Sequence, residues 1–73
     1  MKILDLHGIR HEMVERSVVN FVFYNDFPMK IITGKSPRMI EIVHRVLDKH
    51  GFKYHPENFI NYGAYIIQDK TKQ

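Results

Sequence analysis

Hydrophobic and polar residues recur along the chain at two spacings. Four short apolar stretches have the length of β-strands, and two longer stretches repeat apolar residues every three or four positions, as α-helices do. The predicted elements, in chain order, are a strand at 2–7, a helix at 11–25, a strand at 29–33, a helix at 37–50, and strands at 52–55 and 64–68.

Each predicted helix has one apolar face. These faces consist of Val14, Val18, Phe21 and Val22 in the first helix, and of Ile40, Val43 and Leu47, flanked by Met39 and Val46, in the second. Ser36 followed by Pro37 is typical of a helix start, and Gly51 is typical of a helix stop. The first helix has no such cap, so packing must stabilise it. Glu41 and Arg45 are spaced for an ion pair on the second helix.

The order of these elements predicts an α/β chain of the α+β two-layer kind. Two right-handed crossovers place both helices on one face of a mixed four-stranded sheet and leave the other face open. The last strand is expected to lie antiparallel between the second and third strands, or at the edge. Residues 56–63 form a loop in which Phe59 and Ile60 turn inward, and residues 69–73 fray. The chain has 73 residues, so 1–73 is expected to be a single domain.

Composition narrows the function classes. The chain has no cysteine, which excludes disulfides, thiolate zinc sites and a cysteine nucleophile. No apolar run approaches the roughly 20 residues that cross a bilayer, and charge interrupts the first five residues too early for a secretory signal. We therefore expect a soluble, cytoplasmic protein without a membrane partner. A net charge of +3 permits a nucleic-acid partner without demanding one.

The first candidate site is the stretch Ile3-Leu4-Asp5-Leu6-His7-Gly8, which predicts a buried strand that ends at a glycine. Asp5 and His7 share one face of that strand but lie roughly 7 Å apart along it, too far for a hydrogen bond without twist or a bulge. In one interpretation His7 is a general acid or base, and Asp5 orients it or holds a cation. In the other, Asp5 accepts backbone N–H groups and His7 caps a helix or the sheet edge.

The second candidate site is the turn Thr33-Gly34-Lys35-Ser36, which leads into the second helix. Free N–H groups and the helix dipole favour an anion there, and Lys35 and Arg38 add positive charge. A P-loop is excluded, because Met29 occupies the position that requires glycine. The alternative is an ordinary strand-to-helix turn. Because carboxyl ends of parallel strands share one sheet edge, both motifs are expected to form a single site.

Histidines and aromatic residues add less. The five histidines show no pair spaced for zinc on one helix face, so no metal ligand is predicted; they are His7, His11, His44, His50 and His55. Four aromatic residues cluster on the last two strands, either as sheet packing or, for one or two tyrosines, as open-face platforms for bases; they are Phe52, Tyr54, Tyr62 and Tyr65.

Together these motifs resemble the small MutS-related (Smr) domain over nearly the whole chain. Leu4-Asp5-Leu6-His7-Gly8 matches the family's LDLHG motif, Thr33-Gly34-Lys35-Ser36 matches TGxG except at its last position, and Gly63 leads the closing strand. The resemblance implies a fold like the C-terminal domain of translation initiation factor three. It also implies binding of DNA or RNA and, as in several members, endonuclease activity by nicking or structure-dependent cleavage.

The resemblance also implies roles for single residues. Asp5 and His7 carry the catalytic motif, and the nucleic-acid-binding set is Gly8, Arg10, Thr33, Gly34, Lys35, Ser36 and Arg38. A Mg²⁺ or Mn²⁺ cofactor is left open, because one carboxylate is a poor site for such an ion.

The last position of the second motif leaves alternatives open. Ser36 and Pro37 replace a glycine and a small residue, which stiffens the turn and removes one N–H donor. A non-catalytic nucleic-acid-binding module is therefore the second hypothesis, and a protein-interaction domain that uses the open sheet face is the third. The expected oligomeric state is a monomer or a weak homodimer that pairs through an edge strand.

Overall fold

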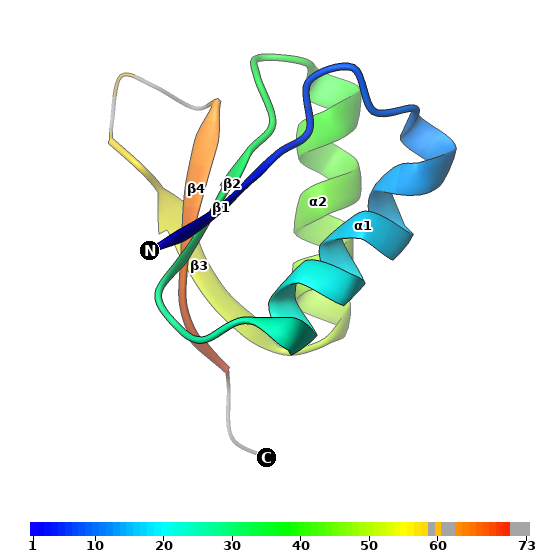
Figure 1. The fold of residues 1–73 in the computed structure, drawn as a ribbon. Coiled ribbons are helices and arrows are strands. Elements are labelled where there is room, and N and C mark those ends of the chain that lie inside the picture. The colour runs from blue at the N-terminus through cyan, green and yellow to red at the C-terminus, as the bar shows by residue number, and fades with distance from the viewer. Residues whose placement is uncertain (59, 61–62, 71–73) are drawn as a thin grey trace.

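The computed structural model describes residues 1–58, 60 and 63–70. Its elements are β1 (Lys2–Asp5), α1 (His11–Tyr24), β2 (Met29–Ile32), α2 (Pro37–Lys49), β3 (Phe52–Pro56) and β4 (Ala64–Lys70). Within this part of the chain, two helices and four strands occur in the predicted order, which confirms the α+β fold class (Figure 1). Neither of these helices has the length and apolar character needed to span a membrane.

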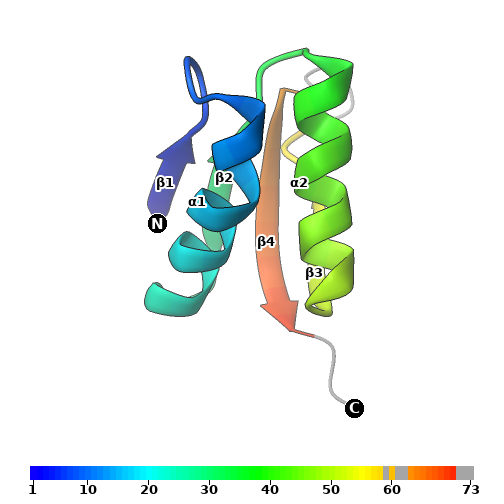
Figure 2. The ribbon, with the colours of Figure 1, turned by 90° about the vertical axis from the view of Figure 1, so that its right-hand side faces the viewer.

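The strands form one mixed sheet in the order β1-β2-β4-β3. β1 and β2 are parallel, whereas β4 runs antiparallel to both of its neighbours. The last strand therefore returns between the second and third strands, the first of its two predicted places. Both helices cover the same face of the sheet, as predicted, and no helix of the described residues covers the other face (Figure 2).

The hydrophobic core lies between the sheet and the two helices. Its completely buried side chains are Leu6, Val14, Val18, Met29, Ile31, Val43, Leu47 and Ile67. Val14, Val18 and Val22 confirm the predicted face of α1, and Phe21 packs against it half-buried. On α2 the buried arc includes Ile42, which the sequence prediction missed, whereas the predicted Ile40 lies at the margin of the arc and is only half-buried.

The first strand is shorter and more exposed than predicted. β1 ends at Asp5 rather than at residue 7, and it is an edge strand that pairs only with β2. Ile3 is 56% exposed, and Leu4 is half-buried. Leu6 is completely buried but follows the strand, with its N–H donating to the carbonyl of Ile32 at 2.9 Å. The prediction of a buried strand at 2–7 was therefore wrong. Ile3 pairs with Lys30 on the uncovered face of the sheet, and the edge position gives Leu4 a neighbouring strand on one side only among the described residues.

The closing strand is longer than predicted and includes part of the expected tail. Asp69 pairs with Lys53 of β3 in the sheet register. The ammonium of Lys70 lies over the rings of Phe23 and Phe52, at 5.1 and 5.6 Å from their centroids. These contacts explain why residues 69 and 70 continue the strand instead of fraying. Residues 71–73 lie outside the described residues, as do Phe59 and Tyr62.

Two further local expectations fail. On α2 the ion pair joins Arg38 to Glu41 at 2.6 Å, one turn towards the helix start from the predicted pair with Arg45. Side chains that are three or four residues apart meet on the surface of a helix. Within the described chain, Glu41 is the only carboxylate that pairs with Arg38. Ile60 is 89% exposed and does not turn inward, whereas Phe59 lies outside the described residues.

The described tyrosines of the sheet face the helices. Tyr65 is buried, and its ring and that of Tyr54 both contact the ring of His44 on α2. The hydroxyl of Tyr54 donates to Asp48 at 2.8 Å. Neither ring therefore serves as a platform for bases on the open face, and packing against α2 is their observed role.

Acid is expected to destabilise this fold through His44. Its Nε2 is buried without a partner among the described residues, and burial lowers the pKa of His44 although the nearby Asp48 carboxylate opposes this. The unfolded chain then takes up the proton at a higher pH than the folded chain, so the free energy of unfolding falls as pH drops below about 6.5. Urea unfolding of the wild type and of H44F at pH 7.5 and 5.5 measures this. An equal pH dependence in both proteins would contradict the assignment.

Candidate active site

Asp5 and His7 form a hydrogen-bonded pair at the carboxyl end of β1. Nδ1 of His7 lies 2.7 Å from Oδ1 of Asp5, and the backbone N–H of His7 donates to the same oxygen at 2.9 Å. These bonds, the backbone one foremost, lower the pKa of Asp5 below its ordinary value. Because an ionised carboxylate only accepts hydrogen bonds, Nδ1 of the neutral ring carries the proton and Nε2 keeps its lone pair.

A turn after β1 brings the two side chains closer than an extended strand allows. The strand stops at Asp5, Gly8 has a φ of 80°, and the N–H of Ile9 donates to the carbonyl of Leu6 at 3.0 Å. The expected separation of roughly 7 Å applies only to extended backbone, so it was wrong for this segment. The same carboxylate orients the ring, as in the first interpretation, and accepts a backbone N–H, which is the part of the second interpretation that concerns Asp5.

The second motif meets the first at Gly34. The turns after β1 and β2 lie at the same end of the molecule (Figures 1 and 2). Gly34 has a φ of 68°, and a Cβ built on it would lie 3.0 Å from Nε2 of His7. A side chain at this position would therefore push the imidazole aside by a few tenths of an ångström. The structure thus places the two predicted motifs side by side, and His7 and Gly34 line one hollow.

The backbone of the second turn is less available to an anion than predicted. The N–H groups of Thr33 and Gly34 both donate to the carbonyl of Gly63, at 2.8 and 3.0 Å. The hydroxyl of the buried Thr33 donates to the carbonyl of Gly34 at 2.7 Å. These bonds fix the turn against the start of β4 but occupy two of its donors. Thr33 and Gly34 therefore shape the site rather than offer N–H groups to a phosphate.

The side chains of this turn differ in what they offer. Lys35 is exposed, and its ammonium has no carboxylate partner within the described chain. Arg38 is paired with Glu41, so a phosphate must compete with that carboxylate for it. Ser36 caps α2, because its Oγ accepts the N–H of Met39 at 3.3 Å, as predicted. Lys35 is therefore the cation best placed to meet a phosphate.

The two remaining residues of the predicted nucleic-acid-binding set precede α1. Arg10 is exposed, pairs with Glu12 at 3.6 Å, and lines a separate surface beside α1. Gly8 directly follows His7, and its positive φ of 80° belongs to the turn after β1. Arg10 therefore lies on a different surface from His7 and Gly34, whereas Gly8 adjoins His7.

A hollow of about 360 Å³ opens beside His7 on the uncovered face of the sheet. Its lining among the described residues is His7, Lys30, Ile32, Gly34, Lys35, Glu57, Gly63 and Ala64. Three of these were predicted site residues, and the other five were missed. The alternation along β2 could have placed Lys30 and Ile32 on the open face, but the approach of Glu57, Gly63 and Ala64 depends on how β4 pairs with β2.

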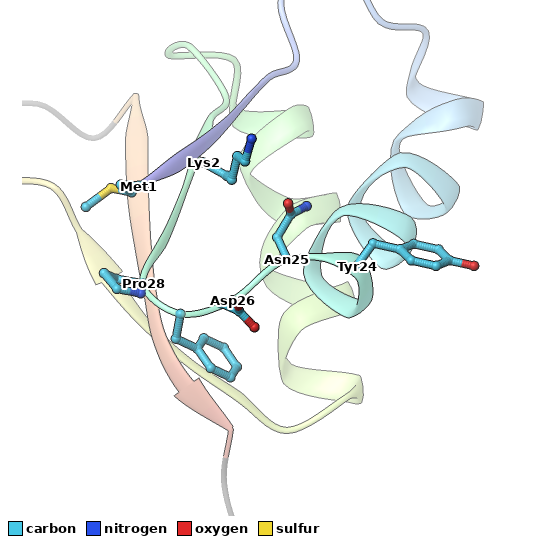
Figure 3. Close-up of a pocket in the computed structure, with 7 residues that line it drawn as sticks. Met1, Lys2, Tyr24, Asn25, Asp26 and Pro28 are labelled. Atoms are coloured by element: carbon cyan, nitrogen blue, oxygen red, sulfur yellow. The ribbon is translucent and has the colours of Figure 1, made fainter.

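A second hollow, of about 290 Å³, lies at the opposite ends of these two strands, where β1 begins and the chain passes from α1 into β2 (Figure 3). Lys2, Asn25 and Asp26 supply its polar groups, and the ring of Tyr24 points away from it. Asn25 is already used, because its Nδ2 donates to the carbonyl of Phe21 at 2.8 Å. No pair of side chains resembling Asp5 and His7 lines this hollow within the described residues.

The described residues form no cluster of side chains that would hold a resident metal ion. The described residues contain no group of three histidine, aspartate or glutamate side chains close enough to hold one ion. Oδ1 of Asp5 already accepts two hydrogen bonds from His7, and Glu57 is engaged with Lys30. What the arrangement can do chemically is proton transfer at Nε2 of His7, next to the positive charge of Lys35.

Comparison with known proteins adds no relative to these observations: no protein-family model, curated protein or solved structure matches the chain.

Proposed function

We propose that this chain binds nucleic acid and cleaves its phosphodiester bonds, with His7 as the general acid or base. The proposal rests on the position and the hydrogen bonding of the imidazole of His7. Asp5 is hydrogen-bonded to Nδ1 of this ring, while Nε2 lies near Gly34 beside the hollow. The side chain of His7 is 65% exposed, so a substrate can reach it.

Each residue has a defined part in the proposed reaction. Nε2 of His7 accepts a proton from the attacking hydroxyl or water, or in its protonated form donates one to the leaving oxygen. Asp5 fixes the ring and stabilises the imidazolium while it exists. Lys35 balances the negative charge that grows on the phosphate oxygens. The donor set holds no metal by itself, so no step is assigned to one.

The resemblance to Smr domains supports the same proposal from the sequence. The two motifs that carry the resemblance are 25 residues or more apart in the chain, yet the ring of His7 touches the position of Gly34. The resemblance to the C-terminal domain of translation initiation factor three remains an expectation about the fold.

A binding module without nuclease activity is the second candidate. The bonds from Thr33 and Gly34 to Gly63, together with the pair between Arg38 and Glu41, favour it. They leave fewer donors to hold a scissile phosphate in place than the sequence motif predicts. The binding module would use the same surface as the proposed nuclease and would differ from it only in not cleaving the nucleic acid.

A cleavage assay separates the two candidates. The purified chain is incubated with supercoiled plasmid and with a structured RNA, each with Mg²⁺, with Mn²⁺ and with EDTA. The nuclease proposal predicts cleavage of at least one substrate, and the EDTA lane shows whether an added cation is required. Binding at low salt without cleavage in any lane would establish the binding module instead. Absence of both binding and cleavage would exclude the two candidates together.

Replacing Lys35 by alanine is expected to weaken nucleic-acid binding and to make it less sensitive to salt. One phosphate contact contributes about one unit to the slope of log K against log salt, so the slope should fall by about one. Fluorescence anisotropy between 50 and 200 mM salt measures it. K53A is the matched control. Lys53 is also exposed, but it lies near the start of β3, whereas the hollow is next to the end of that strand. Equal losses in both variants would indicate a general charge effect.

A further inference from the structure

A partly buried ion pair borders the hollow next to His7. Nζ of Lys30 lies 2.5 Å from Oε2 of Glu57, and the two side chains are only 20% and 33% exposed. The backbone N–H of Glu57 donates to the carbonyl of Ala64 at 2.9 Å, which ties this residue to β4. By contrast, the Arg38–Glu41 pair is 56% and 62% exposed. The Lys30–Glu57 pair is thus held in place as a fixed donor beside a fixed acceptor.

Between the Lys30–Glu57 pair and His7, the floor of the hollow consists of small and apolar residues. Lys30, Ile32 and Gly34 alternate along β2 and its turn, so Ile32 separates the ion pair from the contact with His7. Ile32 pairs with Ala64 in the register of the sheet. The hollow of about 360 Å³ falls at the lower end of the range for small-molecule sites, about 300–1,000 Å³. A flat ring can lie on this floor with its polar edge against Lys30 and Glu57.

We propose that this hollow binds one base of the nucleic acid substrate and prefers guanine. The inference rests on the proposed function and names the substrate feature that the same site selects. The ammonium of Lys30 donates to O6 of guanine, and the carboxylate of Glu57 accepts from its N1–H and its amino group. Oε1 of Glu57 has no hydrogen-bond partner within the described chain and is available for this.

The other bases match this pair less well. Adenine and cytosine each present one amino group next to ring acceptors, and uracil presents one N–H between two acceptors. A carboxylate therefore gains one hydrogen bond from each of them, against two from guanine. Because these contacts use the edge that pairs in a duplex, the bound base must be unpaired. The site thus selects a single-stranded segment or a loop.

Titration of the isotope-labelled chain with the four ribonucleoside monophosphates, followed by amide chemical shifts, tests this inference. GMP should shift the amides of Lys30, Ile32, Glu57 and Ala64 and should bind about tenfold more tightly than AMP, CMP or UMP. E57Q should remove most of this preference, because an amide supplies one acceptor where the carboxylate supplies more. E12Q, which alters an exposed pair outside the hollow, should keep the preference.

The outcomes are distinguishable from failure of the proposed function, because the readout is binding and not cleavage. Equal affinity for all four nucleotides would overturn the base preference. Shifts confined to His7, Lys35 and Arg38, reproduced by inorganic phosphate, would show a phosphate site alone and would also overturn it. K30M provides a second test in case E57Q does not fold. K30M should bind GMP more weakly while its spectrum remains that of the folded chain. Unchanged GMP binding by K30M would count against the proposal.

Discussion

Replacing His7 by alanine is expected to reduce cleavage by about 10²- to 10⁴-fold, the usual contribution of a general acid or base. Affinity for nucleic acid should change little, because Lys35 supplies the positive charge in the hollow. Stability should also change little, since the side chain of His7 is largely exposed and its partner Asp5 can bind water in its place. The measurement is the initial rate of cleavage beside the dissociation constant for the same substrate.

Two controls make this result specific. H11A removes another exposed histidine four residues away that does not line the hollow, and it should cleave at the wild-type rate. Added imidazole should restore part of the activity of the His7 variant, since the missing group is then supplied from solution. Equal cleavage by wild type and H7A would mean that the activity comes from another site or from a contaminant.

Replacing Gly34 by alanine is expected to damage both stability and cleavage. A residue with a side chain at a φ of 68° costs roughly 1–2 kcal/mol relative to ordinary backbone. The new Cβ would also lie 3.0 Å from Nε2 of His7, so the ring would have to move by a few tenths of an ångström. Because a shift of about 1 Å at a catalytic group can cost about 10²-fold in rate, this smaller shift should cost less than that. Urea unfolding and the cleavage assay measure the two effects separately.

The matched control for this variant is G51A. Gly51 also has a positive φ, of 76°, but it follows α2 and does not line the hollow beside His7. The two variants should therefore lose similar stability, and only G34A should cleave more slowly for its stability. If both lose activity in proportion to stability, backbone strain alone explains the effect and the contact with His7 is irrelevant.

The candidate site was partly predictable from the residues in sequence. Asp5, His7, Gly34 and Lys35 stand out because polar and glycine residues interrupt apolar strands at their carboxyl ends, and parallel pairing brings such ends together. The hydrogen bond between Asp5 and His7 was not predictable from strand spacing. It depends on the early end of β1, which an edge strand with one neighbour permits.

The residues that complete the hollow come from the far end of the chain. Glu57 and Ala64 lie beside Lys30 and Ile32 only because β4 inserts next to β2. The sequence allowed that insertion or an edge position, and local propensity cannot distinguish them. In the same way, the carbonyl of Gly63 takes the N–H groups that the sequence motif offers to an anion.

The amino-acid sequence by itself determined the order of elements, the apolar face of α1, most of the apolar face of α2 and the cap of α2, because these depend on neighbours within one or two turns. Tertiary structure decided the exposure of β1, the extension of β4 over residues 69 and 70, and the burial of Nε2 of His44. Those features depend on which segments meet in space. The energy of a hydrogen bond or of a buried group depends on the atoms that surround it. Packing across the whole fold determines which atoms those are.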